Sequence, residues 1–124
     1  MREMERSLVL VGATLAGLAV LLGAFGAHAL KSRIGADALG WWQTAVQYQM
    51  WHALAVLALG LAGARWARPA GWLLAAGAMF FSLSLYALAL GAPRWVGAAT
   101  PIGGLAMICG WVLLPWRAAQ SAKG

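Results

Sequence analysis

Four long apolar runs, separated by short polar breaks, dominate the pattern along this chain. The runs that contain no Asp, Glu, Lys or Arg are residues 7–30, 38–64, 69–93 and 95–116. A helix needs about 20 apolar residues to cross the hydrocarbon core of a bilayer. Because the runs lack the alternation of barrel strands and exceed their length, each one predicts a transmembrane helix. The expected spans are about residues 7–30, 44–64, 70–91 and 96–116.

The breaks between the runs are short, and short connections make consecutive helices antiparallel neighbours. The sequence therefore predicts an all-α fold, an integral membrane bundle of four antiparallel helices that forms a single domain over residues 1–124. The first break is the longest. Residues 34–43 fit a short helix at the membrane surface, with Trp41 and Trp42 at headgroup level.

The fourth and first runs each admit two interpretations at one end. Thr100 followed by Pro101 has the pattern of an N-cap and a first helical position, or else Pro101 lies inside a helix that begins earlier. Residues 27–29 match a signal-peptide cleavage site. The apolar stretch before them, residues 8–26, is longer than the core of about 7 to 15 residues in signal peptides. We therefore expect the first span to be retained.

Composition agrees with lipid as the solvent for much of the surface. Hydrophobic residues make up 63% of the chain and charged residues 10%, whereas soluble domains contain about 25% charged residues. The net charge of +6 comes from basic residues that are spread between the apolar runs. They do not form the basic patch of a nucleic-acid-binding surface, so we expect no nucleic-acid partner. The single cysteine, Cys109, lies within an apolar run and excludes an intramolecular disulfide.

The basic residues also predict an orientation, because the cytoplasmic loops of membrane proteins are enriched in Lys and Arg. With four spans, the two termini and the second connection share one side. That side carries Arg2, Arg6, Arg65, Arg68, Arg117 and Lys123. The other side carries Lys31, Arg33 and Arg94. We therefore expect both termini to lie in the cytoplasm.

Small residues recur at spacings of three and four along the spans, as they do where membrane helices pack closely. The predicted packing positions of the first span are Gly12, Ala16, Ala19, Gly23 and Gly26. The fourth span has a similar stripe that contains Gly103, Ala106 and Gly110. In the third span the stripe is Gly71, Ala75, Ala78 and Ser82. Three such stripes in one chain predict a tightly packed bundle.

Polar side chains in the expected outer half of the bundle form the candidate site. The candidate cluster is His28, Gln47, Tyr48, His52, Ser84, Tyr86 and Thr100. An unpaired polar group is unfavourable in hydrocarbon, so we expect these side chains to converge inside the bundle. Tyr48 and His52 are one helical turn apart and are expected to share a face.

Several of these residues lie in motifs that resemble a known family. The motifs are Gly-Ala-Phe-Gly-Ala-His at 23–28, Tyr-Gln-Met-Trp-His-Ala-Leu at 48–54, Ser-Leu-Tyr at 84–86, Thr-Pro-Ile-Gly-Gly at 100–104 and Gly-Trp at 110–111. In this order, over nearly the whole chain, they resemble the YgdD-like membrane proteins, the domain-of-unknown-function family DUF423. Leu83 departs from the family pattern, which usually has Gly between the two serines. The resemblance implies a small bacterial inner-membrane protein with four helices and with no established activity.

Four hypotheses account for the candidate cluster. The first is a hydrogen-bonded network that fixes the helices. The second is a site that handles a small ligand, a lipid or protons, since ionisable residues such as His28 and His52 within membrane spans are candidates for function. The third is axial haem or metal ligation by these two histidines. The fourth is catalysis by Ser84 or Tyr86 with His52 as base, which lacks an orienting carboxylate within the spans.

The first hypothesis is the one that we favour, and the second is the alternative. We expect a non-enzymatic protein with a structural or accessory role, without catalytic residues, metal or cofactor. The expected partners are membrane lipid and either further copies of the chain or a larger membrane complex.

Overall fold

The computed structural model describes residues 3–122 and contains four long helices within that range. They are α1 (Arg6–Phe25), α2 (Ala36–Ala62), α3 (Arg68–Ala89) and α4 (Trp95–Ser121). A π-helical turn, Gly26–Leu30, extends α1, and a 3-10 turn, Arg65–Ala67, leads into α3. By length and composition, all four helices suffice to cross a membrane. The predicted all-α class with four membrane-spanning helices is therefore confirmed.

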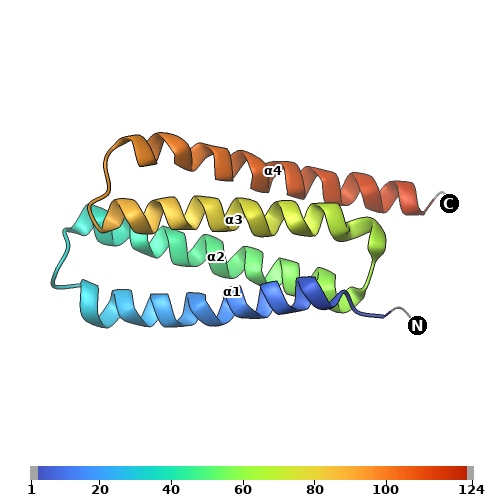
Figure 1. Ribbon diagram of the computed structural model, residues 1–124, viewed down its shortest axis with the longest axis horizontal. Coiled ribbons are helices and arrows are strands. Elements are labelled where there is room, and N and C mark those ends of the chain that lie inside the picture. Colours follow the sequence, from blue (N-terminus) through green and yellow to red (C-terminus); the bar gives the residue numbers. More distant parts are fainter. Residues whose placement is uncertain (1–2, 123–124) are drawn as a thin grey trace.

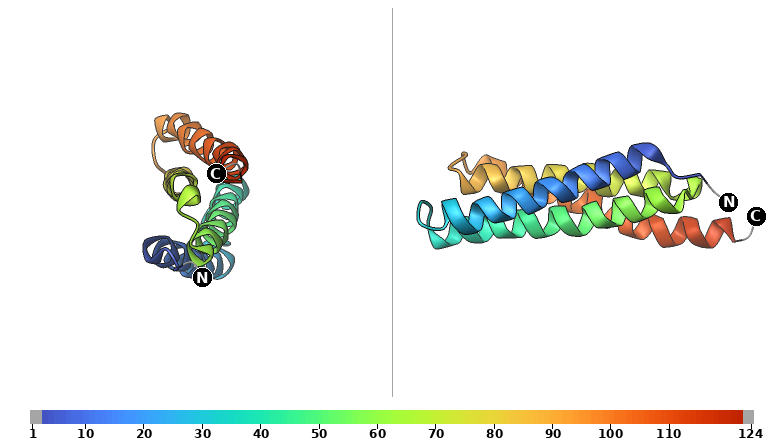
Figure 2. Two further views of the ribbon diagram at one scale, coloured as in Figure 1. Left: turned by 90° about the vertical axis from the view of Figure 1, so that its right-hand side faces the viewer. Right: turned by 90° about the horizontal axis from the view of Figure 1, so that it is seen from below.

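The helices run antiparallel in chain order, with their connections at alternate ends (Figure 1). The most extensive contacts join α1 to α2, α2 to α3, and α3 to α4. Seen along the bundle, α1 and α4 lie at opposite edges, with α2 and α3 between them (Figure 2). The bundle is thus a series of neighbouring helices in which the outer two pack mainly on one partner each. This leaves a large part of α1 and α4 for contact with lipid.

Two helices begin earlier than the sequence suggested. The prediction of a separate surface helix at residues 34–43 was wrong, because α2 starts at Ala36 and continues without a break. Asp37 lies in its first turn, where a carboxylate favours the helix amino terminus. Likewise α4 starts at Trp95, so Pro101 lies inside it and Thr100 is not an N-cap. The hydroxyl of Thr100 instead lies 3.3 Å from the carbonyl oxygen of Val96.

Glycines set the close approach of α1 to α2. A Cβ atom at Gly12 would lie 2.6 Å from the backbone nitrogen of Leu57, a distance that side chains do not tolerate. Gly60 on α2 is equally confined, since its Cβ would lie 2.7 Å from the nitrogen of Val9. The two backbones therefore touch at this crossing, as small-residue interfaces in membranes permit.

A second glycine crossing joins α3 to α4. A Cβ atom at Gly103 would lie 2.5 Å from the nitrogen of Phe81, and one at Gly77 would lie 2.8 Å from the nitrogen of Met107. Further along α4, Gly110 faces the side chain of Leu74, whose Cδ2 would be 2.8 Å from an added Cβ. Both Gly103 and Gly110 are buried, and both belong to the packing stripe that the sequence predicted for the fourth span.

The stripe predicted in α1 is only partly buried. Ala19 is fully buried, and Gly26 is held against the indole ring of Trp42. Ala16 and Gly23 are half-buried. An added Cβ at Gly23 would meet only a methyl group of Val46, at 3.3 Å. The tight contacts of α1 therefore lie at Gly12 and at Gly26, with a looser stretch between them.

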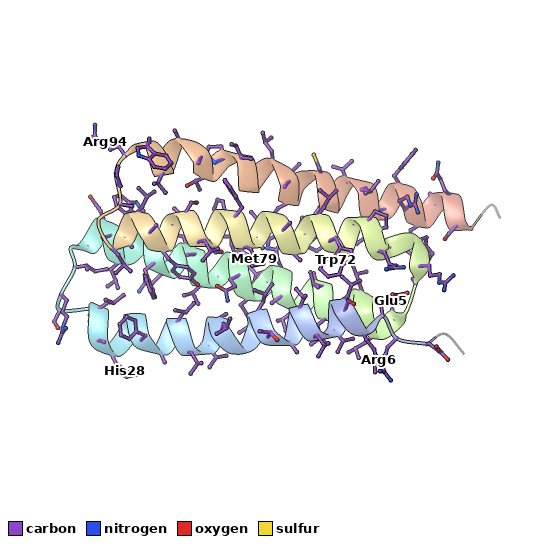
Figure 3. The ribbon with its side chains drawn as sticks, in the orientation of Figure 1. Glu5, Arg6, His28, Trp72, Met79 and Arg94 are labelled. Carbon is purple, nitrogen blue, oxygen red and sulfur yellow. The ribbon has the colours of Figure 1, made fainter. Side chains whose placement is uncertain are left out.

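Charged side chains gather at the two ends of the bundle (Figure 3). Glu5 and Arg6 lie at the end that carries the α2–α3 connection, whereas Arg94 lies at the opposite end with His28. Glu5 forms an ion pair with Arg68, with 3.4 Å between Oε2 and Nε. Arg2 and Lys123, which entered the orientation argument, lie outside the described residues.

Candidate functional site

Gln49, in the middle of α2, links three helices by hydrogen bonds. Its Nε2 donates to the carbonyl oxygen of Leu15 on α1 at 2.8 Å. Its Oε1 accepts from the hydroxyl of Tyr86 on α3, also at 2.8 Å. Gln49 and Tyr86 are 5% and 7% exposed, so both bonds are shielded from solvent and lipid. We call this pair of hydrogen bonds the Gln49 bridge.

Two further hydrogen bonds from side chain to backbone support the Gln49 bridge. Ser82 on α3 donates from Oγ to the carbonyl oxygen of Ala45 on α2 at 2.8 Å. Trp42 on α2 donates from Nε1 to the carbonyl oxygen of Leu22 on α1 at 2.8 Å. The indole of Trp42 also packs on the ring of Tyr86, with 4.6 Å between ring centroids. Beside the Gln49 bridge, the α2–α3 pair and the α1–α2 pair are therefore each tied by one more hydrogen bond.

His52 connects α2 to α4. The indole Nε1 of Trp111 donates to Nε2 of His52 at 3.0 Å, and Nδ1 of His52 lies 2.7 Å from the carbonyl oxygen of Tyr48. A single tautomer satisfies both contacts. In it the neutral imidazole carries its proton on Nδ1 and accepts at Nε2. The ring is 5% exposed, and both of its nitrogens are engaged within the protein.

The hydroxyl pair of Ser84 and Thr100 connects α3 to α4. Their oxygens are 2.7 Å apart, and Ser84 Oγ also lies 2.7 Å from the carbonyl oxygen of Phe81. Each hydroxyl has one proton. If Ser84 donates to Phe81, Thr100 is the donor within the pair. The pair thus links α3 to α4 through two hydroxyls that each also lie near a carbonyl oxygen of their own helix.

The predicted cluster separates into buried and exposed members. His52, Ser84, Tyr86 and Thr100 are buried and hydrogen-bonded, although they form distinct contacts rather than one cavity. Tyr48 is half-buried, and its ring packs on Phe81 with 4.7 Å between centroids.

The prediction that the whole cluster converges inside the bundle was wrong for His28 and Gln47, which are both exposed. His28 lies in the π-helical turn at the end of the bundle. Gln47 is two residues from Gln49, about 200° around an ideal helix, so it points away from the interior.

The most connected residues were outside the predicted cluster. Gln49 entered only within the motif at 48–54, Ser82 only as the last position of the third-span stripe, and Trp42 as a residue at headgroup level. A signal for Gln49 was present, because Ala45, Gln49 and His52 are spaced by four and three residues and share one helical face. No sequence pattern indicated that Trp111 would reach α2.

Hydrogen bonding is the chemistry that these side chains have in common. Within residues 3–122, every buried side-chain nitrogen and oxygen has a hydrogen-bond partner. In the same range, His, Cys, Asp and Glu side chains form no group of three or more that could hold a metal ion. The charged groups lie at the bundle ends, away from the Gln49 bridge.

Comparison with known proteins places the chain in a family. A family model described as "Protein of unknown function (DUF423)" matches residues 22–104. A UPF0382 membrane protein of Staphylococcus saprophyticus is 46% identical over 112 residues, which covers 86% of this chain and 91% of the relative. YwdK of Bacillus subtilis, also a UPF0382 membrane protein, is 46% identical over 111 residues, with 86% and 90% covered.

A third relative comes from a different bacterial group. The UPF0382 inner membrane protein YgdD of Escherichia coli K12 is 41% identical over 116 residues, which covers 90% of this chain and 88% of the relative. No solved structure matches the chain. The agreement of the family model, the three relatives and the four apolar helices leads to one conclusion: this chain is a membrane protein of the UPF0382 (DUF423) family.

Proposed function

We propose that this protein has a non-enzymatic, structural or accessory role within the membrane. The observation that carries the proposal is the Gln49 bridge, in which one buried amide uses both of its ends to join α1 and α3 through α2. An amide engaged in this way holds helices in register. Its nitrogen and its oxygen each already have a partner within the protein.

The other buried polar contacts support the same role. The contacts of Ser82, of the Ser84–Thr100 pair and of the Trp111–His52 pair each run from one helix to another. Interhelical hydrogen bonds in membrane proteins contribute roughly 0.6 kcal/mol each on average. Several of them together fix the relative depth and rotation of the helices, which apolar packing alone specifies less tightly.

The proposed location is the bacterial inner membrane, with both termini in the cytoplasm. The relative from Escherichia coli is named an inner membrane protein. Four described arginines, Arg6, Arg65, Arg68 and Arg117, belong to the side that carries the termini and the α2–α3 connection. The opposite side carries Lys31, Arg33 and Arg94. The excess of basic residues supports the cytoplasmic assignment of the first side.

Native mass spectrometry of the protein, extracted with its own lipids, tests the proposed role. An accessory role predicts that a stoichiometric protein partner, or a second copy of the chain, is retained. The buried network is then expected to matter only through stability, so variants of Gln49 reduce partner binding in proportion to the folded fraction. A small molecule retained in place of a protein partner, and lost on mutation of Gln49 in a fully folded variant, would contradict the proposal.

A second candidate function is the handling of a lipid chain or small solute. A groove of about 110 Å³ lies between α1 and α3 above the Gln49 bridge. Its walls and floor include Leu15, Leu22, Gln49, Met79, Leu83 and Tyr86. The almost entirely apolar lining suits an acyl chain better than a polar solute. The same mass-spectrometric measurement distinguishes this candidate, because a groove-bound lipid would be lost when Leu83→Trp fills the groove.

A further inference from the structure

Two amide side chains lie on the lipid-facing side of α2. Gln43 and Gln47 are one helical turn apart and exposed, whereas the neighbouring Gln49 is buried. They border a depression of about 290 Å³ between α1 and α2. Its other side is formed by the small residues Gly23, Gly26 and Ala27. A concave surface bordered by two amides thus lies on the outside of the bundle.

The depth of these amides decides which partners reach them. Gln47 lies roughly 16 Å along the axis from the start of α2 at Ala36, and Gln43 roughly 10 Å. The hydrocarbon core is about 30 Å thick, equivalent to about 20 helical residues. With the 27 residues of α2 centred in the bilayer, both side chains fall within the core, and Gln47 lies close to the midplane.

A lipid does not supply the missing hydrogen bonds at that depth. Phospholipid esters and phosphates lie in the interfacial region, and acyl chains have no donors or acceptors. Neither amide forms a side-chain hydrogen bond with another residue in the range 3–122. Because a polar group without a partner is unfavourable in hydrocarbon, a protein surface at the same depth is the partner that suits Gln47.

We infer that this face of α2, bordered by Gln43 and Gln47, is the surface through which two copies of the chain associate. Two copies with the same orientation in the membrane are related by a twofold axis along the membrane normal. Each residue near that axis then meets its counterpart at its own depth. A glutamine amide has an acceptor oxygen and a donor nitrogen, so two facing glutamines satisfy one another.

The surroundings of the two amides suit such an interface. Gly23, Gly26 and Ala27 have no bulky side chains, so a second helix approaches α2 closely on that side. The exposed ring of Trp51 and the side chain of Leu54 continue the same face toward the other end of α2. The two amides lie in one half of this face of α2, and Trp51 and Leu54 form its apolar other half. This difference along the helix gives the interface a defined register.

A second copy of the chain as partner rests on the proposed accessory role. The two can fail independently, because a monomer that binds a different protein would still have an accessory role. The test is the number of copies per complex, counted by single-molecule photobleaching of the labelled full chain in vesicles at several protein-to-lipid ratios. The wild type is expected to form dimers. The Gln43→Leu/Gln47→Leu variant is expected to dissociate with about tenfold weaker association, equivalent to about 1.4 kcal/mol.

Two controls keep the result specific. Leu105→Ala changes an exposed residue on α4, the opposite edge of the bundle, and is expected to leave dimerisation unchanged. In a Cys109→Ala background, Gln47→Cys is expected to form a disulfide-linked dimer under mild oxidation, whereas Leu105→Cys is not. Because both new leucines are exposed in the single chain, the detergent melting temperature of the double variant is expected to match the wild type at a dilution where both are monomeric.

Three outcomes would overturn the inference. They are single copies of the wild type at every protein-to-lipid ratio, a dimer that is unchanged in the double leucine variant, and cross-linking through Leu105→Cys as efficient as through Gln47→Cys. A different protein cross-linked to Gln47→Cys in native membranes, without a second copy, would likewise replace the proposed partner.

Discussion

Replacing Gln49 by leucine is expected to destabilise the bundle by about 2–4 kcal/mol. Leucine has nearly the same size and a helix propensity similar to that of glutamine, so neither a cavity nor a propensity change contributes much. The substitution removes both hydrogen bonds of the Gln49 bridge, to Leu15 and from Tyr86. Two interhelical bonds of roughly 0.6 kcal/mol each account for about 1 kcal/mol.

The rest of the loss comes from the tyrosine left behind. Tyr86 is 7% exposed, and its hydroxyl would have no partner in the variant. A buried hydroxyl without a hydrogen bond costs about 1–3 kcal/mol. The carbonyl oxygen of Leu15 lies within α1 and keeps its helical partner, so it adds little. The effects of Gln49→Leu and Tyr86→Phe are therefore expected not to be additive.

A double-mutant cycle tests both statements. The free energy of unfolding of the wild type, Gln49→Leu, Tyr86→Phe and the double variant is measured by SDS titration in mixed micelles, followed by circular dichroism. Tyr86→Phe is expected to destabilise the wild type but to be neutral or stabilising in the Gln49→Leu background, with a coupling energy of about 0.6–1.7 kcal/mol. Gln47→Leu, measured at a dilution where the chain is monomeric, is the matched control and is expected to change stability little. Additivity within about 0.5 kcal/mol would refute the bridge as the cause.

Three further predictions follow from the same structure. Gly12→Leu is expected to lower the detergent melting temperature far more than Val20→Leu, because Gly12 touches the backbone of α2 whereas Val20 is 61% exposed; equal melting temperatures would remove this crossing as a packing determinant. Trp111→Phe keeps the aromatic packing but loses the hydrogen bond to the α2 histidine. It is expected to lower the free energy of unfolding by roughly 0.6–1.7 kcal/mol in the SDS titration, and a value indistinguishable from wild type would show that the bond contributes nothing. Reporter fusions within residues 65–68 are expected to report the cytoplasm and those within 31–37 the outside, with the opposite pattern reversing the orientation.

The helices were predictable because their signal is strong and local. Four charge-free runs of membrane-spanning length leave few alternatives in a bilayer, and the structure has helices in all four. The exact start of a helix depends on weaker preferences. Residues 34–43 contain aromatic and polar residues that fit a surface helix or the first turns of a long helix equally well, and the structure continues α2 through them.

The partners of the polar residues were harder to predict than their burial. Whether Gln47 or Gln49 faces the interior depends on the rotation of α2 about its axis. That rotation is fixed by the helices that pack against Gly60 and Ala45. The hydrogen bond from Trp111 depends on the tilt of α4 relative to α3, which is established where Gly77 meets Gly103. Neither rotation nor tilt is encoded in a short motif, so the network emerges only from the assembled bundle.

The serial arrangement of the helices determines how the molecule yields to a pulling force. Each helix is held chiefly by its neighbours in the chain. Besides α3, α4 contacts the His52 side chain of α2 and the 3-10 turn, where Arg117 Nε donates to the carbonyl oxygen of Trp66. Tension applied at the carboxyl end therefore loads these contacts of α4 first and extracts α4 before the other three helices separate. The next step, removal of α3, requires the Tyr86–Gln49 and Ser82–Ala45 hydrogen bonds to break. The molecule consequently resists extraction in two unequal steps, with the larger resistance held by its first three helices.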